Sequence, residues 1–136
     1  MSETSKLTIF LLAIFGSASC FSLAGSCVNQ VITEYPSPSG DVRLIVFERS
    51  CGATTDFSTQ ASLVPRTTDL PNDGGNVFIA DTDHGAVPTA SWGGPDLGVA
   101  WLSDNRLELS HHCLARIFLA SNTWQSIQIE YAECES

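Results

Sequence analysis

Cysteine is the residue type with the clearest chemical potential in this chain, which holds five copies of it. Cys51, Cys113 and Cys134 lie far apart and show none of the CxxC or CxxH spacings of a zinc site. Such thiols in an exported chain usually pair, so a disulfide is the simplest interpretation. Because Cys134 is near the C-terminus, a bond from it to Cys51 or Cys113 would keep the last strand from fraying.

The surroundings of Cys51 also permit a reactive thiol. Arg49 and the backbone amides of the loop that follows could favour the thiolate, and the hydroxyls of Thr54 and Thr55 could donate to a bound anion. Thiol chemistry at Cys51 and a binding loop at Thr54 and Thr55 are therefore hypotheses, with a disulfide or a buried thiol as the alternative.

Histidines and carboxylates are the other residue types in this chain that could bind a metal. His111, His112 and Cys113 are of types that bind zinc or copper, but adjacent strand residues point to opposite faces, so the two histidines should not share an ion. The Asp-Thr-Asp-His-Gly segment 81–85 lacks the further carboxylates of a calcium loop, which favours a self-bonded turn. Neither a Gly-x-Ser-x-Gly elbow nor a His-Glu-x-x-His motif occurs. No catalytic residue, metal or cofactor is assigned, and an enzyme is the less favoured class.

A long irregular segment, 82–95, contains the one tryptophan that does not belong to a predicted strand or its flank. Loops of this length in a small domain are often functional. Trp92 stands in its Gly- and Pro-rich second half, where an exposed ring could contact a partner. A tryptophan that folds back to cover a sheet edge is the alternative.

The N-terminal segment predicts export. Lys6 precedes the apolar run 7–15, and small, weakly polar residues follow as far as Ser26, which is the order of regions in a secretory signal. An uncleaved anchor is the alternative, because 7–28 is an uncharged stretch long enough to span a membrane as one helix. Both interpretations export residues 27–136 as a single domain, with 1–26 as the signal peptide or membrane anchor.

Two cysteines follow small residues, as the lipidated cysteine of a bacterial lipoprotein does. Cys27 stands behind Leu-Ala-Gly-Ser, and Cys20 stands behind Gly-Ser-Ala-Ser. Lipidation of Cys27, with Cys20 as the alternative, predicts a lipoprotein anchored in the bacterial envelope and facing the periplasm or the exterior. Plain cleavage before Cys27 would instead give a soluble periplasmic or secreted domain. If Cys27 carries lipid, the other three cysteines of the domain can form one disulfide and leave one thiol. If it does not, four cysteines allow three disulfide connectivities.

Charge limits the range of partners. The chain has a formal net charge of −9, and its only lysine is Lys6 in the leader. A nucleic-acid backbone is therefore not an expected partner. An acidic surface could attract a basic protein or peptide, although keeping the domain soluble is the simpler role for this charge.

The elements that must position these residues are strands. Period-two segments separated by turn residues predict an all-β domain, a small antiparallel sandwich or barrel of about eight strands. The predicted strands are 30–35, 41–49, 57–64, 76–81, 97–102, 106–110, 116–120 and 126–132. Segment 41–49 is apolar on both faces and should be central, whereas 57–64 should have one wetter face.

The block Cys-Gly-Ala-Thr-Thr-Asp-Phe-Ser-Thr-Gln at 51–60, preceded by Phe-Glu-Arg at 47–49, resembles an uncharacterised family of short bacterial lipoprotein-like proteins. The shared order extends from a Ser-Pro-x-Gly turn to Gly-Asn-Val-Phe at 75–78 and a later Trp-rich hairpin. Residues between Cys20 and Cys27 and the His111-His112-Cys113 triplet depart from that pattern. The resemblance implies export and supplies no activity.

Two functional hypotheses follow. The first is a non-catalytic binding or structural module of the envelope that presents the Cys51 loop and the Trp92 loop to a protein or glycan. The second is a small thiol-active or enzymatic protein that uses Cys51 as a thiolate, which requires Cys51 to be free.

Overall fold

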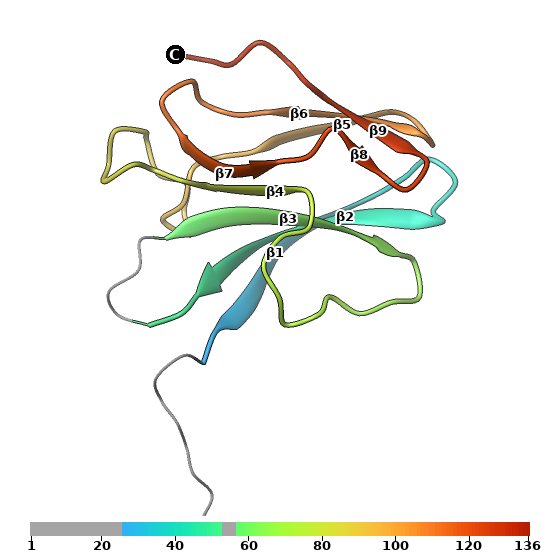
Figure 1. Ribbon diagram of the computed structural model, residues 1–136, viewed down its shortest axis with the longest axis horizontal. Coiled ribbons are helices and arrows are strands. Elements are labelled where there is room, and N and C mark those ends of the chain that lie inside the picture. The colour runs from blue at the N-terminus through green and yellow to red at the C-terminus, as the bar shows by residue number, and fades with distance from the viewer. Residues whose placement is uncertain (1–25, 53–56) are drawn as a thin grey trace, which may run out of the picture.

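The computed structural model describes residues 26–52 and 57–136, which form two stacked β-sheets (Figure 1). The described residues contain nine strands and no helix. The larger sheet has the order β1-β2-β3-β4-β7. Its strands are β1 (Val28–Pro36), β2 (Val42–Ser50), β3 (Ser58–Pro65), β4 (Phe78–Asp81) and β7 (Arg116–Ala120). The smaller sheet has the order β5-β6-β9-β8. Its strands are β5 (Gly98–Ser103), β6 (Arg106–Ser110), β9 (Ile127–Tyr131) and β8 (Thr123–Trp124).

The all-β prediction is confirmed, and each of the eight predicted segments overlaps a strand. The two-residue strand β8 was not predicted, because it is too short to show any periodicity. One pair, β6 with β9, is parallel, although all the other ladders are antiparallel. The parallel pair arises because the chain leaves the smaller sheet after β6, adds β7 to the larger sheet and then returns.

Strand β2 is an inner strand of the larger sheet, as its two apolar faces predicted, but it is next to the edge strand β1, and the middle strand is β3. It pairs with β1 on one side and β3 on the other, and Leu44, Ile45, Val46 and Phe47 are all buried. Leu44 and Val46 face the smaller sheet and join the main core, whereas Ile45 and Phe47 form a second cluster with Val64 on the outer face. A strand that is apolar on both faces must be packed against other parts of the protein on both faces.

The main core lies between the two sheets. Its buried side chains come from both layers, which explains why the alternating apolar positions of β3, β6 and β9 share one interior. These residues are Leu44, Val46, Ala61, Leu63, Val77, Phe78, Ala80, Leu97, Leu107, Leu109, Ile127 and Ile129.

The outer face of the larger sheet is covered by the connection between β3 and β4, residues 66–77 (Figure 1). Leu70 packs on the outer apolar cluster. The polar residues of β3 on this side are buried rather than wet, because loop backbone groups bond to them. The amide of Gly75 donates to Gln60 Oε1 at 2.7 Å, and the amide of Asn76 donates to Ser62 Oγ at 3.0 Å. Hydrogen bonds satisfy these buried polar atoms.

The predicted signal or anchor segment falls almost wholly on residues 1–25, which lie outside the described residues. In the described part of the chain, no helix is long and apolar enough to cross a membrane.

Candidate functional site

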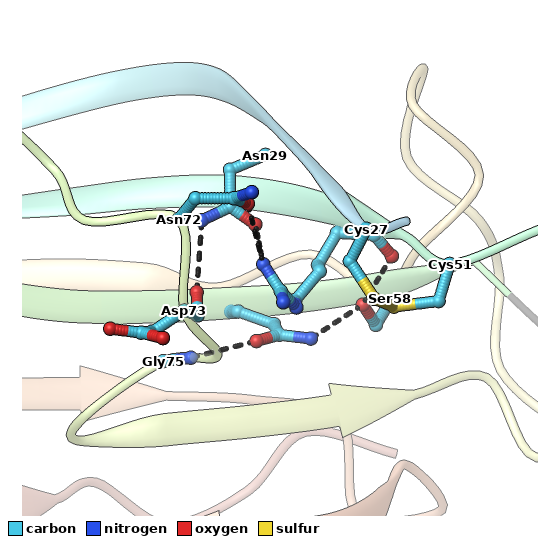
Figure 2. Close-up of a disulfide and its surroundings, with 9 residues drawn as sticks. Cys27, Asn29, Cys51, Ser58, Asn72, Asp73 and Gly75 are labelled. Carbon is cyan, nitrogen blue, oxygen red and sulfur yellow. Dashed lines mark hydrogen bonds between the residues drawn. A yellow bond between two sulfur atoms is a disulfide. The ribbon is translucent and has the colours of Figure 1, made fainter. Parts of the chain in front are cut away.

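A disulfide between Cys27 and Cys51 fixes the start of the edge strand β1 to the end of β2 (Figure 2). The two cysteines extend the ladder by one position beyond the Val28–Ser50 pair, and their Cα atoms are 4.1 Å apart. The bond holds β1 in register where a terminal edge strand would otherwise fray.

This bond weighs against Cys27, the favoured lipidation site. A lipid thioether needs the sulfur of Cys27, and that sulfur is bonded to Cys51. The alternative, Cys20, lies outside the described residues, as do Thr54 and Thr55 of the predicted binding loop. The same bond leaves Cys51 without the free thiol that redox chemistry requires.

A second disulfide joins Cys113 to Cys134, one of the two pairings expected for the C-terminal cysteine. Two main-chain hydrogen bonds accompany it. The amide of Cys113 donates to the carbonyl of Glu135 at 2.8 Å, and the amide of Glu135 donates to the carbonyl of His111 at 3.3 Å. The C-terminal segment is therefore tied to the residues that follow β6.

Two residues before Cys51, Arg49 links β1, β2 and the 66–77 loop. Its Nη1 donates to Asn29 Oδ1 at 2.7 Å and to Asn72 Oδ1 at 3.1 Å. Asn29 in turn donates from Nδ2 to the carbonyls of Pro71 and Asp73 at 3.0 and 2.9 Å. Long-range polar bonds of this kind fix the loop beside the edge strand, and sequence patterns do not reveal them.

Trp92 folds back onto β3, an inner strand of the larger sheet. Its Nε1 donates to Thr59 Oγ1 at 2.9 Å, and the Thr59 hydroxyl donates to the carbonyl of Pro95. Gly93, with φ of 93°, packs against Phe57, where a Cβ would come within 2.8 Å of the ring. Glycine is required here both by the backbone conformation and by this close approach. The half-buried indole is thus held in one position.

Two grooves flank β1, one on each side of the sheet. The inner groove, about 470 Å³, lies toward the Trp92 loop. It is lined by Gln30, Val31, Ile32, Glu48, Ser91 and Trp92. The outer groove, about 280 Å³, lies toward the 66–77 loop. It is lined by Cys27, Val28, Asn29, Val31, Leu70, Pro71 and Asn72.

The strand between these grooves exposes apolar side chains. Val28 is 63% exposed and Val31 is 48% exposed. Val28 and Val31 are three residues apart in a stretch whose register with β2 is regular, so their side chains point to opposite faces of the sheet. The register shift in the β1–β2 ladder follows, between Val31 and Thr33. Val31, Glu48 and Leu70 were not predicted as candidate binding residues. They come together only in the tertiary structure, and no local sequence pattern marks them.

His111 and His112 line a different pocket, of about 250 Å³, which also includes Asp96, Ser110 and Glu135. His111 Nδ1 is 2.9 Å from the carbonyl of His112, and His112 Nδ1 accepts from the amide of Leu114 at 3.1 Å. Across residues 26–52 and 57–136, no group of three histidine, cysteine or acidic side chains is arranged to hold a metal ion. These ring nitrogens support the local backbone.

The segment 81–85 is the self-bonded turn that was expected in place of a calcium loop. Asp81 Oδ1 accepts from the amide of Asp83 at 2.9 Å, and both carboxylate oxygens accept from Arg116. Burial by itself would raise the pKa of Asp81, but the hydrogen bonds from Arg116 and the Asp83 amide, together with the charge of Arg116, hold it below its ordinary value. The carboxylate of Asp81 therefore forms a structural ion pair with Arg116.

Comparison of the chain with family models, curated proteins and solved structures finds no match.

Proposed function

We propose that this chain is an exported, envelope-associated binding module that does no chemistry on its ligand, and that the β1 edge with its two grooves is the binding surface. The observation that carries the proposal is a fixed edge strand with exposed apolar residues between two hollows. Exposed apolar residues beside concave surfaces are typical of binding sites. The ligand class is a protein or glycan of the envelope.

Export is supported by the two disulfides, because such bonds persist in oxidising compartments and are rare in the cytosol. The order of charged, apolar and small residues at the N-terminus points the same way. Since the Cys27 sulfur is bonded to Cys51, we assign the lipid of an envelope-anchored form to Cys20. Intact mass and thiol mapping of protein from its native envelope test this assignment. A diacyl or triacyl mass on Cys20 supports it, and a chain that begins at an unmodified Cys27 contradicts it.

The thiol-active alternative is not favoured by any observation. It requires Cys51 as a thiolate, and the structure pairs that sulfur with Cys27. The same thiol mapping tests this point, since a folded protein in which Cys51 is alkylated without reduction would restore the alternative.

Binding is tested with the purified protein immobilised through its N-terminus and exposed to detergent-solubilised envelope. We expect Val31→Ser and Trp92→Ala to reduce the retained material severalfold, because both residues line the inner groove. Phe118→Ser is the matched control, since Phe118 is 61% exposed on the opposite edge strand, β7. Equal retention by wild type and both groove variants would contradict the proposal.

A further inference from the structure

The β1 edge combines features that together define the kind of ligand it fits. In the described part of the chain, β1 pairs only with β2, so its second side has main-chain groups without a strand partner. An extended polypeptide can add to such an edge, with main-chain hydrogen bonds for affinity and pockets for alternate side chains for specificity. Positions 28–31 are in regular register with β2, and the disulfide fixes their start.

The two grooves lie on opposite faces of the sheet. Trp92 of the inner groove bonds to Thr59, which is on the same face of β3 as the core residues Ala61 and Leu63. Leu70 of the outer groove packs on the outer cluster. Consecutive side chains of a strand point to opposite faces, so neighbouring residues of one added strand would enter the two grooves.

The inner groove has the chemistry to bind a cation. Glu48 lies opposite Gln30 in the ladder and lines the groove together with the indole of Trp92. Within residues 26–52 and 57–136, Glu48 takes part in none of the ion pairs. A lysine or arginine side chain in this groove would meet a carboxylate and an aromatic face. The net charge of −9 would favour the approach of a basic segment.

The outer groove is more apolar. Val31, Leu70 and Pro71 supply aliphatic surface, whereas the amides of Asn29 and Asn72 are already engaged with Arg49 and the loop. A branched aliphatic side chain would bury surface there without leaving those polar groups unpaired.

We propose that β1 binds an extended polypeptide by strand addition, with a basic side chain between Glu48 and Trp92 and the adjacent aliphatic side chain against Val31 and Leu70. This inference rests on the proposed binding function of the same edge. A polypeptide is favoured over a glycan because the unpaired strand edge matches another main chain, a match that a sugar ring does not make.

The probe is a capped octapeptide of alternating valine and lysine, with a valine and glutamate octapeptide as its control. By titration calorimetry, the lysine peptide should bind and the glutamate peptide should not. Glu48→Gln should weaken binding of the lysine peptide at least fivefold. Glu108→Gln, which neutralises a half-buried glutamate on β6 of the other sheet, should leave it unchanged. Equal affinities for the two peptides, or equal effects of the two substitutions, would overturn the charge assignment.

Strand addition is tested by methylating backbone nitrogens of the peptide, which requires no change in the protein. The N–H groups of the valines and those of the lysines point to opposite edges of an extended peptide. Methylation of one set should abolish binding, and methylation of the other should preserve it. If both methylated peptides bind, or neither does, strand addition is wrong.

The proposed function and this inference can fail separately. If envelope glycan fragments bind in a Trp92-dependent manner while the lysine peptide does not, the inference is overturned and the binding function stands. If the Trp92→Ala and Val31→Ser proteins retain envelope material as wild type does, the assignment of function to this edge fails as well.

Discussion

The two edges of the larger sheet, β1 and β7, both expose apolar side chains and yet differ in shape and charge. On β7, Ile117 is 37% exposed and Phe118 is 61% exposed, comparable with Val31 and Val28 on β1. The β7 edge is modified locally: the ladder with β4 shifts between Ile79 and Ala80, and the Arg116 guanidinium lies 5.1 Å from the centre of the Phe118 ring. Bulges and charges of this kind discourage pairing with another chain.

The β1 edge has the opposite arrangement. Its register shift falls at Val31–Thr33, beyond a regular stretch that the Cys27–Cys51 disulfide fixes, and a groove lies on each side of that stretch. Exposure of apolar residues is therefore not what distinguishes the proposed binding edge, β1, from the β7 edge. The β1 edge differs from the β7 edge in its regular backbone, in the groove on each side and in the carboxylate of Glu48. Each of these three features can be altered separately.

The largest effect should come from removing the first disulfide. The double variant Cys27→Ser/Cys51→Ser should lose about 3 kcal/mol of unfolding free energy, because the bond closes a loop with a sequence separation of 24 residues. It should also bind the lysine peptide at least tenfold more weakly, because β1 then frays. Urea denaturation and titration calorimetry measure the two effects.

The matched control is Cys113→Ser/Cys134→Ser, whose sequence separation of 21 residues predicts a similar stability loss of about 3 kcal/mol. Its peptide affinity should equal that of wild type, because the second disulfide holds the C-terminal segment and not β1. A similar loss of affinity in both double variants would mean that the first disulfide does not specifically order the binding edge.

The second prediction concerns the β7 side. Asp81→Asn removes the carboxylate that Arg116 bonds, and we expect a loss of about 2 kcal/mol at pH 7. Because the pKa of Asp81 is lowered from 3.8 in the folded state, its contribution is complete above pH 3.8 and declines as the pH falls through the folded value. The difference between wild type and variant should therefore be smaller at pH 2 than at pH 7 in urea denaturation.

Asp83→Asn is the control for that change, since Asp83 is exposed and its oxygen is 3.9 Å from Arg116 Nη1. It should alter stability by less than about 0.5 kcal/mol. Both aspartate variants should bind the lysine peptide as wild type does. A pH-independent difference for Asp81→Asn would show that the ionised carboxylate is not what stabilises this turn.

The third prediction tests how Trp92 is fixed. Thr59→Val removes the hydroxyl that accepts from the indole and donates to Pro95, and should cost about 1 kcal/mol of stability. The lysine peptide should bind a few times more weakly, because the ring then loses its fixed position. Thr59→Ser keeps the hydroxyl and should restore most of the affinity. If valine and serine behave alike, the hydrogen bond does not position Trp92.

The sequence predicted strands better than it predicted surfaces, for a physical reason. The apolar residues on both faces of β2 predicted a strand that is covered on both sides, which it is. The position of Cys134 near the C-terminus left Cys51 and Cys113 as candidate partners, and its bond is to Cys113. The grooves depend instead on loops that return to β1 from distant parts of the chain. Leu70 and Trp92 reach that edge through long-range hydrogen bonds and packing, which leave no local periodic pattern.

The polar residues of β3 also show that a local sequence pattern does not reveal long-range contacts. Gln60 and Ser62 alternate with Ala61 and Leu63 and therefore predicted a wetter face, yet both are buried beneath the 66–77 loop. A hydrogen-bonded polar residue can be buried as completely as an apolar one, and only the position of its partner decides which occurs. That partner, the backbone at Gly75 and Asn76, is itself placed by tertiary structure.

The smallest effect on stability should come from Phe118→Ser on β7. This variant also compares the two sheet edges most directly. The change removes an exposed ring near a guanidinium, so stability should change by about 0.5 kcal/mol or less. Peptide affinity should remain that of wild type, whereas Val31→Ser, a smaller change at the other edge, should reduce it severalfold. The two variants remove exposed apolar side chains from edge strands of one sheet, so a difference in binding isolates the contribution of the grooves. If Phe118→Ser weakened binding and Val31→Ser did not, the roles assigned to the two edges would be reversed.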